Sequence, residues 1–254
     1  MIEAEFIHRY GPKMAVALLL TFASGIVDII GYIGVFHFFT AHLTGTTVKL
    51  GHSLVNHDWT DFYAAVAVVG AFVAGSILGR ALIEIGSRRR IRRIASVTLT
   101  IEAVLLAALT ETHLHLHYAG SPYWGLAVLS AAMGIQTATL TGIGPLTVHT
   151  TFVTGMVNKT AQLITRIGFR AHDLPRSGSR MSQVRREQRD DIQMTLFLIG
   201  VWLFYVGGAA MGTWSFNSWG LRALFIAIGL LAVGLATDQF WPLSIKEEKE
   251  QSES

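Results

Sequence analysis

The stretch that decides the fold reads Thr40-Ala41-His42-Leu43-Thr44-Gly45-Thr46-Thr47-Val48-Lys49, and a second stretch reads Thr150-Thr151-Phe152-Val153-Thr154-Gly155-Met156-Val157-Asn158-Lys159. Both fit the pattern T-x-x-x-T-G-x-x-x-K. Each stretch is too polar to cross a lipid bilayer by itself and too apolar for an ordinary loop. The repeated pattern predicts that the chain contains two related units.

The sequence around the two stretches repeats in the same order. Each stretch follows an apolar run that carries glycines, Gly25 to Gly34 in one case and Gly134 to Gly144 in the other. Each is then followed by a run with the helix-contact pattern G-x-x-x-G, Gly75 with Gly79 and Gly208 with Gly212. A repeated order of three features favours duplication over chance.

The composition places these units in a membrane. Of the 254 residues 51% are hydrophobic and only 15% are charged, whereas soluble domains carry about 25% charged residues. The chain has no cysteine, which excludes disulfides, thiolate metal ligands and thiol nucleophiles. We therefore expect an all-α integral membrane protein.

The number of membrane spans follows from the apolar runs. A bilayer core about 30 Å thick requires roughly 20 apolar residues of helix. Six runs qualify as transmembrane helices: Met14–Val35, Phe62–Ile85, Ala95–Leu109, Tyr123–Gly144, Met194–Thr213 and Leu221–Trp241.

The basic residues predict the orientation, because short loops rich in Lys and Arg stay in the cytoplasm. Arg88, Arg89, Arg90, Arg92 and Arg93 lie between the second and third runs. With that loop inside, both termini and the stretch from Arg166 to Arg189 are also inside. The net charge of +3 thus marks the cytoplasmic face of a multi-pass protein in a bacterial inner membrane, and we expect no nucleic-acid partner.

The two units have an odd number of spans each, so the second enters the bilayer from the opposite side. We call residues 14–112 the first half and residues 123–241 the second half of a 3+3 inverted repeat. Such repeats are typical of channels and secondary transporters, whose sites lie at the repeat interface beside broken helices. The two Thr-Gly segments would be re-entrant or broken helices that enter from opposite sides. The remaining segments are a cytoplasmic N-terminus (1–13), an external loop (113–122), a cytoplasmic insertion (171–193) and a disordered tail (242–254).

Several of these residues resemble a known family. The run Gly25-Ile26-Val27-Asp28, then Phe36 and Thr44-Gly45, and the run from Thr150 to Gly155 are similar to the YoaK family of bacterial inner-membrane proteins, a domain of unknown function. The resemblance covers nearly the whole chain except residues 171–190 and 246–254. In that family the first signature reads T-G-N, whereas here Thr46 follows Gly45, which would alter a site that depends on that amide. The resemblance implies a six-span membrane protein and no established activity.

Asp28 is the most informative single residue. It lies about 20 Å into the first span by helix rise, where an ionised carboxylate costs several kcal/mol unless it is paired or hydrated. The corresponding position of the second half is Gln136 or Thr137, so one half alone carries a charge. This pattern indicates a proton or cation coupling site; the alternative is a structural Asp that caps a helix break or pairs with Lys49.

The Thr-Gly segments are the second candidate site. A helix N-terminus attracts anions, and a Lys one turn further on would add charge from each side. The candidate residues are Thr40, Thr44, Gly45, Lys49, Thr150, Thr154, Gly155 and Lys159. The alternative is that Thr and Gly allow close helix packing while each Lys extends to the membrane interface.

Three further features carry weaker signals. Glu102 lies about 10 Å into the third span and is a candidate for a proton relay with Asp28, or a neutral hydrogen-bonded Glu. The external histidines, among them His113, His115 and His117, lack the carboxylates that would complete a ligand set, so no metal is assigned. The Gly75/Gly79 and Gly208/Gly212 faces are candidates for contact with a second copy of the chain.

These observations lead to one preferred function and one alternative. The chain shows no nucleotide-binding loop, hydrolase elbow or zinc-protease pair, so we expect no enzyme and no cofactor. We expect a transporter or channel for a small solute or ion, with the site between the two Thr-Gly segments and Asp28 coupling or gating. The alternative is a membrane scaffold or sensor that uses the basic stretch from Arg166 to Arg189.

Overall fold

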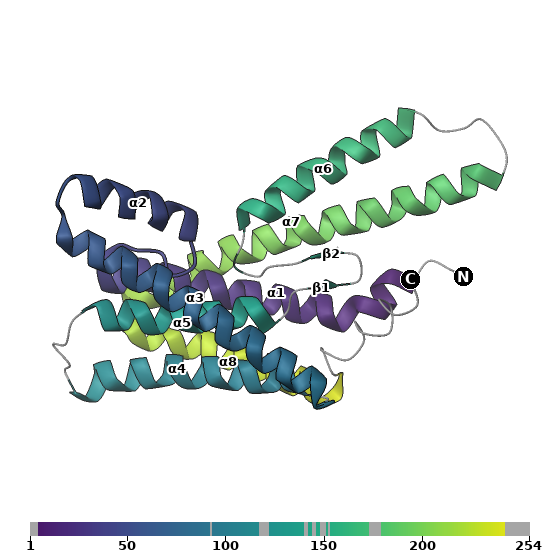
Figure 1. Cartoon of the computed structure of the whole chain (residues 1–254). Coiled ribbons are helices and arrows are strands. Elements are labelled where there is room, and N and C mark those ends of the chain that lie inside the picture. Colours follow the sequence, from purple (N-terminus) through teal and green to yellow (C-terminus); the bar gives the residue numbers. More distant parts are fainter. Residues whose placement is uncertain are drawn as a thin grey trace.

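A computed structural model of the chain describes residues 5–91, 93–116, 122–139, 142–143, 146–147, 151, 153–172 and 179–241. These residues form a helical bundle with one pair of very short strands (Figure 1). The first half contains α1 (Glu5–Gly31), a π-helical turn η1 (Tyr32–Phe36), α2 (Leu43–Val55), α3 (Trp59–Arg88) and α4 (Ile94–Leu116). The second half contains α5 (Pro122–Thr139), β1 (Gly142–Ile143), β2 (Leu146–Thr147), α6 (Val153–His172), α7 (Ser179–Trp219), a 3₁₀ turn η2 (Gly220–Ala223) and α8 (Leu224–Phe240).

Several of the helices are long enough to cross a membrane, as the sequence predicts. Four helical stretches among the described residues are long and apolar enough to span a bilayer: Tyr10–Gly34, Trp59–Arg88, Ile94–His113 and Glu187–Phe240. The last stretch has 54 residues and combines α7 with α8, which are separated at Gly220, where φ is +58°. The protein is therefore an α-helical membrane protein, and the six predicted runs fall on α1, α3, α4, α5, α7 and α8.

Two predicted boundaries were wrong. The fourth run ends at Thr139 rather than Gly144, because the chain then turns into the β1–β2 pair. The third run continues to Leu116, which places His113 and His115 on a helix. The predicted insertion at 171–193 is helical from Ser179 onward, as the beginning of the 41-residue α7. The sequence analysis did not predict this part of α7, because its charged residues interrupt the apolar pattern by which a membrane span is recognised.

Helices α1 and α7 run parallel and touch through glycines. A Cβ atom on Gly25 would lie 2.9 Å from the Ala209 nitrogen, and one on Gly208 would lie 2.9 Å from the Phe22 carbonyl carbon. Gly212 meets the backbone of Ile26 in the same way. The two backbones therefore approach more closely than any side chain permits.

Helices α3 and α5 repeat this contact. A Cβ atom on Gly134 would lie 2.8 Å from the Ser76 nitrogen, and one on Gly75 would lie 2.9 Å from the Ala131 carbonyl carbon. Gly79 meets Ile135. Gly134 follows Gly25 by 109 residues, and Ala131 and Ile135 follow Phe22 and Ile26 by the same number. Helix α5 therefore contacts α3 at the positions that correspond to those where α1 contacts α7.

The G-x-x-x-G faces form helix contacts within one chain, as their pattern indicates. Gly75 and Gly79 are buried against α5, and Gly208 and Gly212 are buried against α1. Both faces are occupied within one chain, because each pairs with a helix of the other half.

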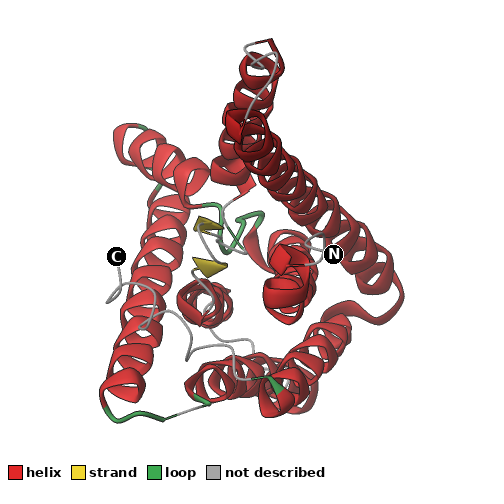
Figure 2. Ribbon diagram, turned by 90° about the vertical axis from the view of Figure 1, so that its right-hand side faces the viewer, coloured by secondary structure: helices red, strands yellow, loops and turns green. Residues whose placement is uncertain are grey.

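The apolar core joins the two halves. Helix α4 packs against α5 and α8, and α1 packs against α8. The largest cluster of buried side chains draws on all four helices, among them Leu20, Leu99, Met133 and Leu231. Figure 2 looks along the bundle and shows inner helices surrounded by the others.

Helices α6 and α7 form an arm that extends away from the bundle (Figure 1). Asp191 of α7 is 4% exposed and accepts hydrogen bonds from Arg170 at 2.8 Å and Arg166 at 3.2 Å. Arg170 also pairs with Glu187 at 3.0 Å. Charges of the basic stretch from Arg166 to Arg189 and of Asp191 therefore hold α6 on α7.

Asp191→Asn is expected to loosen this arm. The amide keeps the shape of the carboxylate but gives up the charge, so both arginines lose their charge-assisted bonds at a cost of about 1–3 kcal/mol. Hydrogen exchange at the α6 amides should become faster than in the wild type. Glu187→Gln, whose parent side chain is 45% exposed, should change the exchange less because exposed ion pairs contribute little. Equal exchange in both variants would contradict the assigned role of Asp191.

Candidate functional site

The candidate site lies where the helical structure is interrupted between α1 and α2. Helix α1 ends at Gly31, continues as the π-helical turn, and stops at His37, where φ is +53°. Gly31 leaves room for the returning chain, since a Cβ atom there would lie 2.5 Å from the Thr40 methyl carbon. The segment before α2 therefore folds back against the last turn of α1 and reaches Asp28.

Asp28 holds this break together. Its side chain is 2% exposed, and Oδ1 accepts hydrogen bonds from the Thr40 nitrogen at 2.6 Å, the Thr40 hydroxyl at 2.9 Å and the Ala41 nitrogen at 3.0 Å. Oδ2 accepts a hydrogen bond from the Tyr205 hydroxyl at 2.5 Å. Four donors directed at one carboxyl group occupy acceptor positions on both of its oxygens. The group acts as a latch that ties the break to α7.

Tyr205 is the member of this site that the sequence did not reveal. It lies 177 positions from Asp28 and belongs to the other half. A signal was nevertheless available: Tyr205 precedes Gly208 by three residues, as Phe72 precedes Gly75. Aligning the glycine pairs therefore shows that only the second half places a hydroxyl at this position.

The equivalent place in the second half has hydroxyls instead of a carboxylate. Thr137, which follows Asp28 by 109 residues, shares a 2.6 Å hydrogen bond with Thr151. The neighbouring Gln136 accepts a hydrogen bond from Ser24 at 2.7 Å and donates to the Leu20 carbonyl at 3.2 Å. Gln136 thus binds α5 to α1 and is separate from the Asp28 cluster in its bonding. Thr150 lies outside the described residues.

The Thr-Gly segments begin helices, as predicted. Thr44 and Gly45 lie in the first turn of α2, and Thr154 and Gly155 lie in the first turn of α6. Both threonine side chains are exposed, in contrast to Thr40, which is fully buried. The two segments therefore start the separate helices α2 and α6, and Thr44 and Thr154 lie on the exposed side of these first turns.

The two predicted lysines have different surroundings. Lys49 pairs with Asp61 of α3 at 3.0 Å and lies 3.7 Å from the centre of the Phe38 ring. It therefore binds to α3 and does not pair with Asp28, whose acceptors are taken by Thr40, Ala41 and Tyr205. Lys159 is half-buried on α6.

Glu102 lies in the apolar core. It is 1% exposed, and its Oε2 atom has no hydrogen-bond partner among the described residues. None of the hydrogen bonds found in that part of the chain joins it to Asp28. The structure thus keeps the two intramembrane carboxyl groups in separate surroundings.

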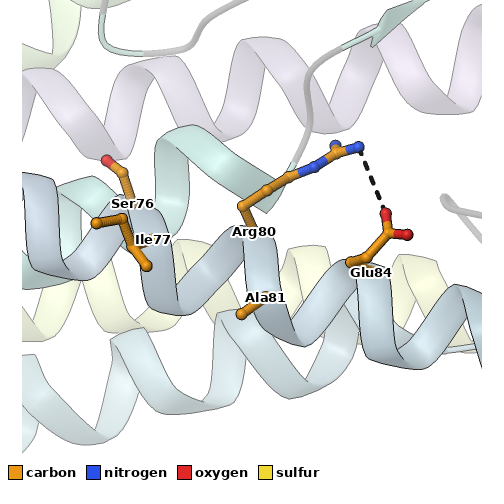
Figure 3. Close-up of a pocket in the computed structure, with 5 residues that line it drawn as sticks. All are labelled: Ser76, Ile77, Arg80, Ala81 and Glu84. Carbon is orange, nitrogen blue, oxygen red and sulfur yellow. Dashed lines mark ion pairs between the residues drawn. The ribbon is translucent and has the colours of Figure 1, made fainter.

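The pocket drawn in Figure 3 lies elsewhere. It is an open depression on α3, lined by Ser76, Ile77, Arg80, Ala81 and Glu84. Arg80 and Glu84 form a 3.9 Å ion pair at its edge. Within the described ranges, no group of three His, Cys, Asp or Glu side chains could hold a metal ion. The candidate site is therefore the helix break at Asp28.

Comparisons with known proteins agree with the membrane character of the chain. The transmembrane protein YoaK of Bacillus subtilis (strain 168), named as UPF0700, is 34% identical over 141 residues. The match spans 54% of this chain and 60% of that relative. No solved structure is significantly similar. The family described as "Protein of unknown function (DUF1275)" matches residues 16–237, and the chain, with its helical membrane fold, belongs to that family.

Proposed function

We propose that the protein is a transporter or channel for a small solute in the bacterial inner membrane, with Asp28 as its gating or coupling carboxylate. The observation that carries this proposal is the set of four hydrogen bonds on Asp28. They join a broken helix of the first half to α7 of the second. A buried carboxylate that bridges two mobile elements is suited to control their relative position.

The proposal includes a 3+3 inverted repeat. The matched glycine registers support it, because α1 meets α7 as α5 meets α3. The remaining contacts correspond as well: α4 packs on α5 as α8 packs on α1, and α2 lies on α3 as α6 lies on α7. In such repeats the solute site lies at the interface between the halves, beside interrupted helices.

The proposed pathway runs past the first turns of α2 and α6. Both turns carry exposed threonines. Helix α2 begins just after Thr40 and Ala41, which bind Asp28. Helix α6 begins just after Thr151, which binds Thr137. The arginine cluster after α3 favours a cytoplasmic position for that end of the bundle. In this orientation α2 faces the outside and α6 faces the cytoplasm.

The hydrogen bonds on Asp28 suggest how this residue could open and close the proposed pathway. Adding a proton to Asp28, or binding a cation to it, removes the charge that attracts the Thr40 and Ala41 amides and the Tyr205 hydroxyl. Charged acceptors bind such donors about twice as strongly as neutral ones. Neutralisation would therefore weaken the bond between the break and α7 and let the start of α2 move.

The test is solute flux through the purified chain in liposomes, measured by the light scattering of vesicles that shrink and reswell after mixing with glycerol, urea or sodium acetate. We expect at least one of these probes to enter faster than it enters protein-free vesicles. Asp28→Asn, which imitates the neutralised carboxyl group and so weakens the latch, should raise that flux. Asp238→Asn is the matched control: Asp238 is equally buried and accepts hydrogen bonds from Ser96 of α4, away from the helix break.

Two results would contradict the proposal. Equal swelling with and without protein for neutral and charged probes alike would argue against transport. A flux that Asp28→Asn leaves as unchanged as Asp238→Asn does would remove Asp28 from the mechanism.

A further inference from the structure

The core of the bundle contains a carboxyl group that the latch does not use. Glu102 occupies a stripe of α4 whose other members are Ala95, Leu99, Leu106 and Leu109, all of them buried in the main apolar cluster. Counting from Ile94, it lies about 12 Å along the helix. A carboxyl group therefore interrupts an apolar contact surface deep in the bundle.

Within the described part of the chain, one oxygen of this carboxyl group lacks a hydrogen-bond donor. Oε2 has no hydrogen-bond partner, a property it shares there with the hydroxyl oxygens of Ser76 and Ser130. A buried hydroxyl without a partner costs a few kcal/mol, whereas a buried carboxylate without a counter-charge costs far more. The carboxyl group in this arrangement is therefore the neutral acid.

The described residues of the elements around α4 provide no counter-charge beside Glu102. On α8, Asp238 is bound to Ser96, six residues or about 9 Å from Glu102 along α4. On α3, Asp61 pairs with Lys49, and Glu84 pairs with Arg80 and Arg88. The other titratable groups among the described side chains of these elements are Tyr63 on α3, Tyr123 at the start of α5, the exposed Arg222 in η2, and Glu111 and His113 toward the end of α4 itself.

The position of Glu102 relates it to both halves. Helix α4 belongs to the first half, and it packs against α5 and α8 of the second. Leu99, one turn before Glu102, touches Gly234 of α8, and Thr98 accepts a hydrogen bond from Thr139 of α5 at 2.9 Å. A charge placed at Glu102 would therefore be created between the two halves, where only their separation could hydrate it.

We propose that Glu102 is a proton-binding site between the halves. When α4 separates from α5 and α8, water reaches the carboxylate and a proton from the water binds to it. When the helices close, the neutral acid is buried as observed. The use of this proton to drive solute movement rests on the proposed function, whereas proton binding itself does not.

Infrared spectroscopy of the full-length chain in liposomes tests this inference. We expect a C=O stretching band of a protonated carboxyl group at low pH that disappears as the pH rises. Glu102→Gln should remove the band, because the amide copies the neutral acid without its proton. Glu111→Gln, an exposed position nine residues further along α4, should leave the band unchanged.

A second measurement needs no variant. Dicyclohexylcarbodiimide is an apolar reagent that reacts with protonated carboxyl groups, and mass spectrometry of the wild-type chain should locate its adduct on Glu102. An adduct elsewhere with none on Glu102, or a Glu102 band that stays constant over the whole pH range, would overturn the proposal. If Glu102 titrates while no probe crosses the vesicles, the proton site stands and the transport proposal fails. If a probe crosses while Glu102 does not titrate, the proton site fails alone.

Discussion

Gly208→Ala is expected to separate α1 from α7 and to destabilise the whole bundle. The added methyl carbon would lie 2.9 Å from the Phe22 carbonyl carbon and closer still to its oxygen. Backbone atoms have no alternative rotamer, so the helices themselves must move apart. Overpacking of this kind costs about 1–3 kcal/mol, more than the roughly 1 kcal/mol that Ala gains over Gly in a helix.

Gly75→Ala should have a similar effect on α3 and α5, because its methyl carbon would lie 2.9 Å from the Ala131 carbonyl carbon. Each variant has a matched control on its own helix. Gly200→Ala of α7 would make an ordinary 3.5 Å contact with Leu18, and Gly70→Ala of α3 would meet nothing within 4 Å. Both controls should be as stable as the wild type or slightly more stable.

The measurement is the fraction of monodisperse protein that survives heating, followed by size-exclusion chromatography in detergent. Gly208→Ala and Gly75→Ala should lose the peak at a clearly lower temperature than the two controls. Equal losses in these two variants would support the equivalence of the halves. If Gly208→Ala were as stable as Gly200→Ala, the close approach of α1 and α7 would be contradicted.

Single cysteines on α2 and α6 should show an all-or-none pattern of exposure to water. On α6 the exposed side chains divide into a polar row that includes Asn158 and Gln162 and an apolar row that includes Val157 and Ile164. On α2, His52 and Leu54 make the same division. In a bilayer the apolar row faces lipid, and the polar row requires water or protein.

The chain has no natural cysteine, so the introduced cysteine is the one thiol of each variant that the reagent can modify. Gln162→Cys should react with a membrane-impermeant, charged thiol reagent from the cytoplasmic side only, and His52→Cys from the outside only. Ile164→Cys and Leu54→Cys should not react from either side. The readout is the mass shift of the protein from intact cells and from inverted vesicles.

Each alternative result has a defined meaning. Reaction of Ile164→Cys as fast as Gln162→Cys would show that water surrounds α6, so that it lies outside the bilayer. Reaction of His52→Cys and Gln162→Cys from the same side would contradict the inverted orientation of the two halves.

Some of the site could be predicted from the sequence because it is local. A carboxylate at Asp28 inside an apolar run is expensive, so its importance is visible without a structure. The same holds for Thr44-Gly45 and Thr154-Gly155, whose pattern correctly marks the beginnings of α2 and α6. The start of α7 could not be found in this way, because residues 179–193 are charged and their helix depends on ion pairs with α6.

The partners of the carboxyl groups were not predictable from local sequence. Tyr205 reaches Asp28 only because α1 and α7 are pressed together through Gly25 and Gly208. Lys49, the nearer cation in sequence, binds Asp61 instead.

The sequence by itself determined the membrane class, the apolar runs, the two Thr-Gly helix starts and the position of Asp28 in depth. These depend on transfer from water to lipid and on local backbone preference, which are properties of short segments. Only the tertiary structure decided which helices touch, that Asp28 is latched by four donors, and that Glu102 lacks a partner for Oε2. Within lipid, helix pairing depends on close packing and on hydrogen bonds between distant segments, and neither is written in any one run of residues.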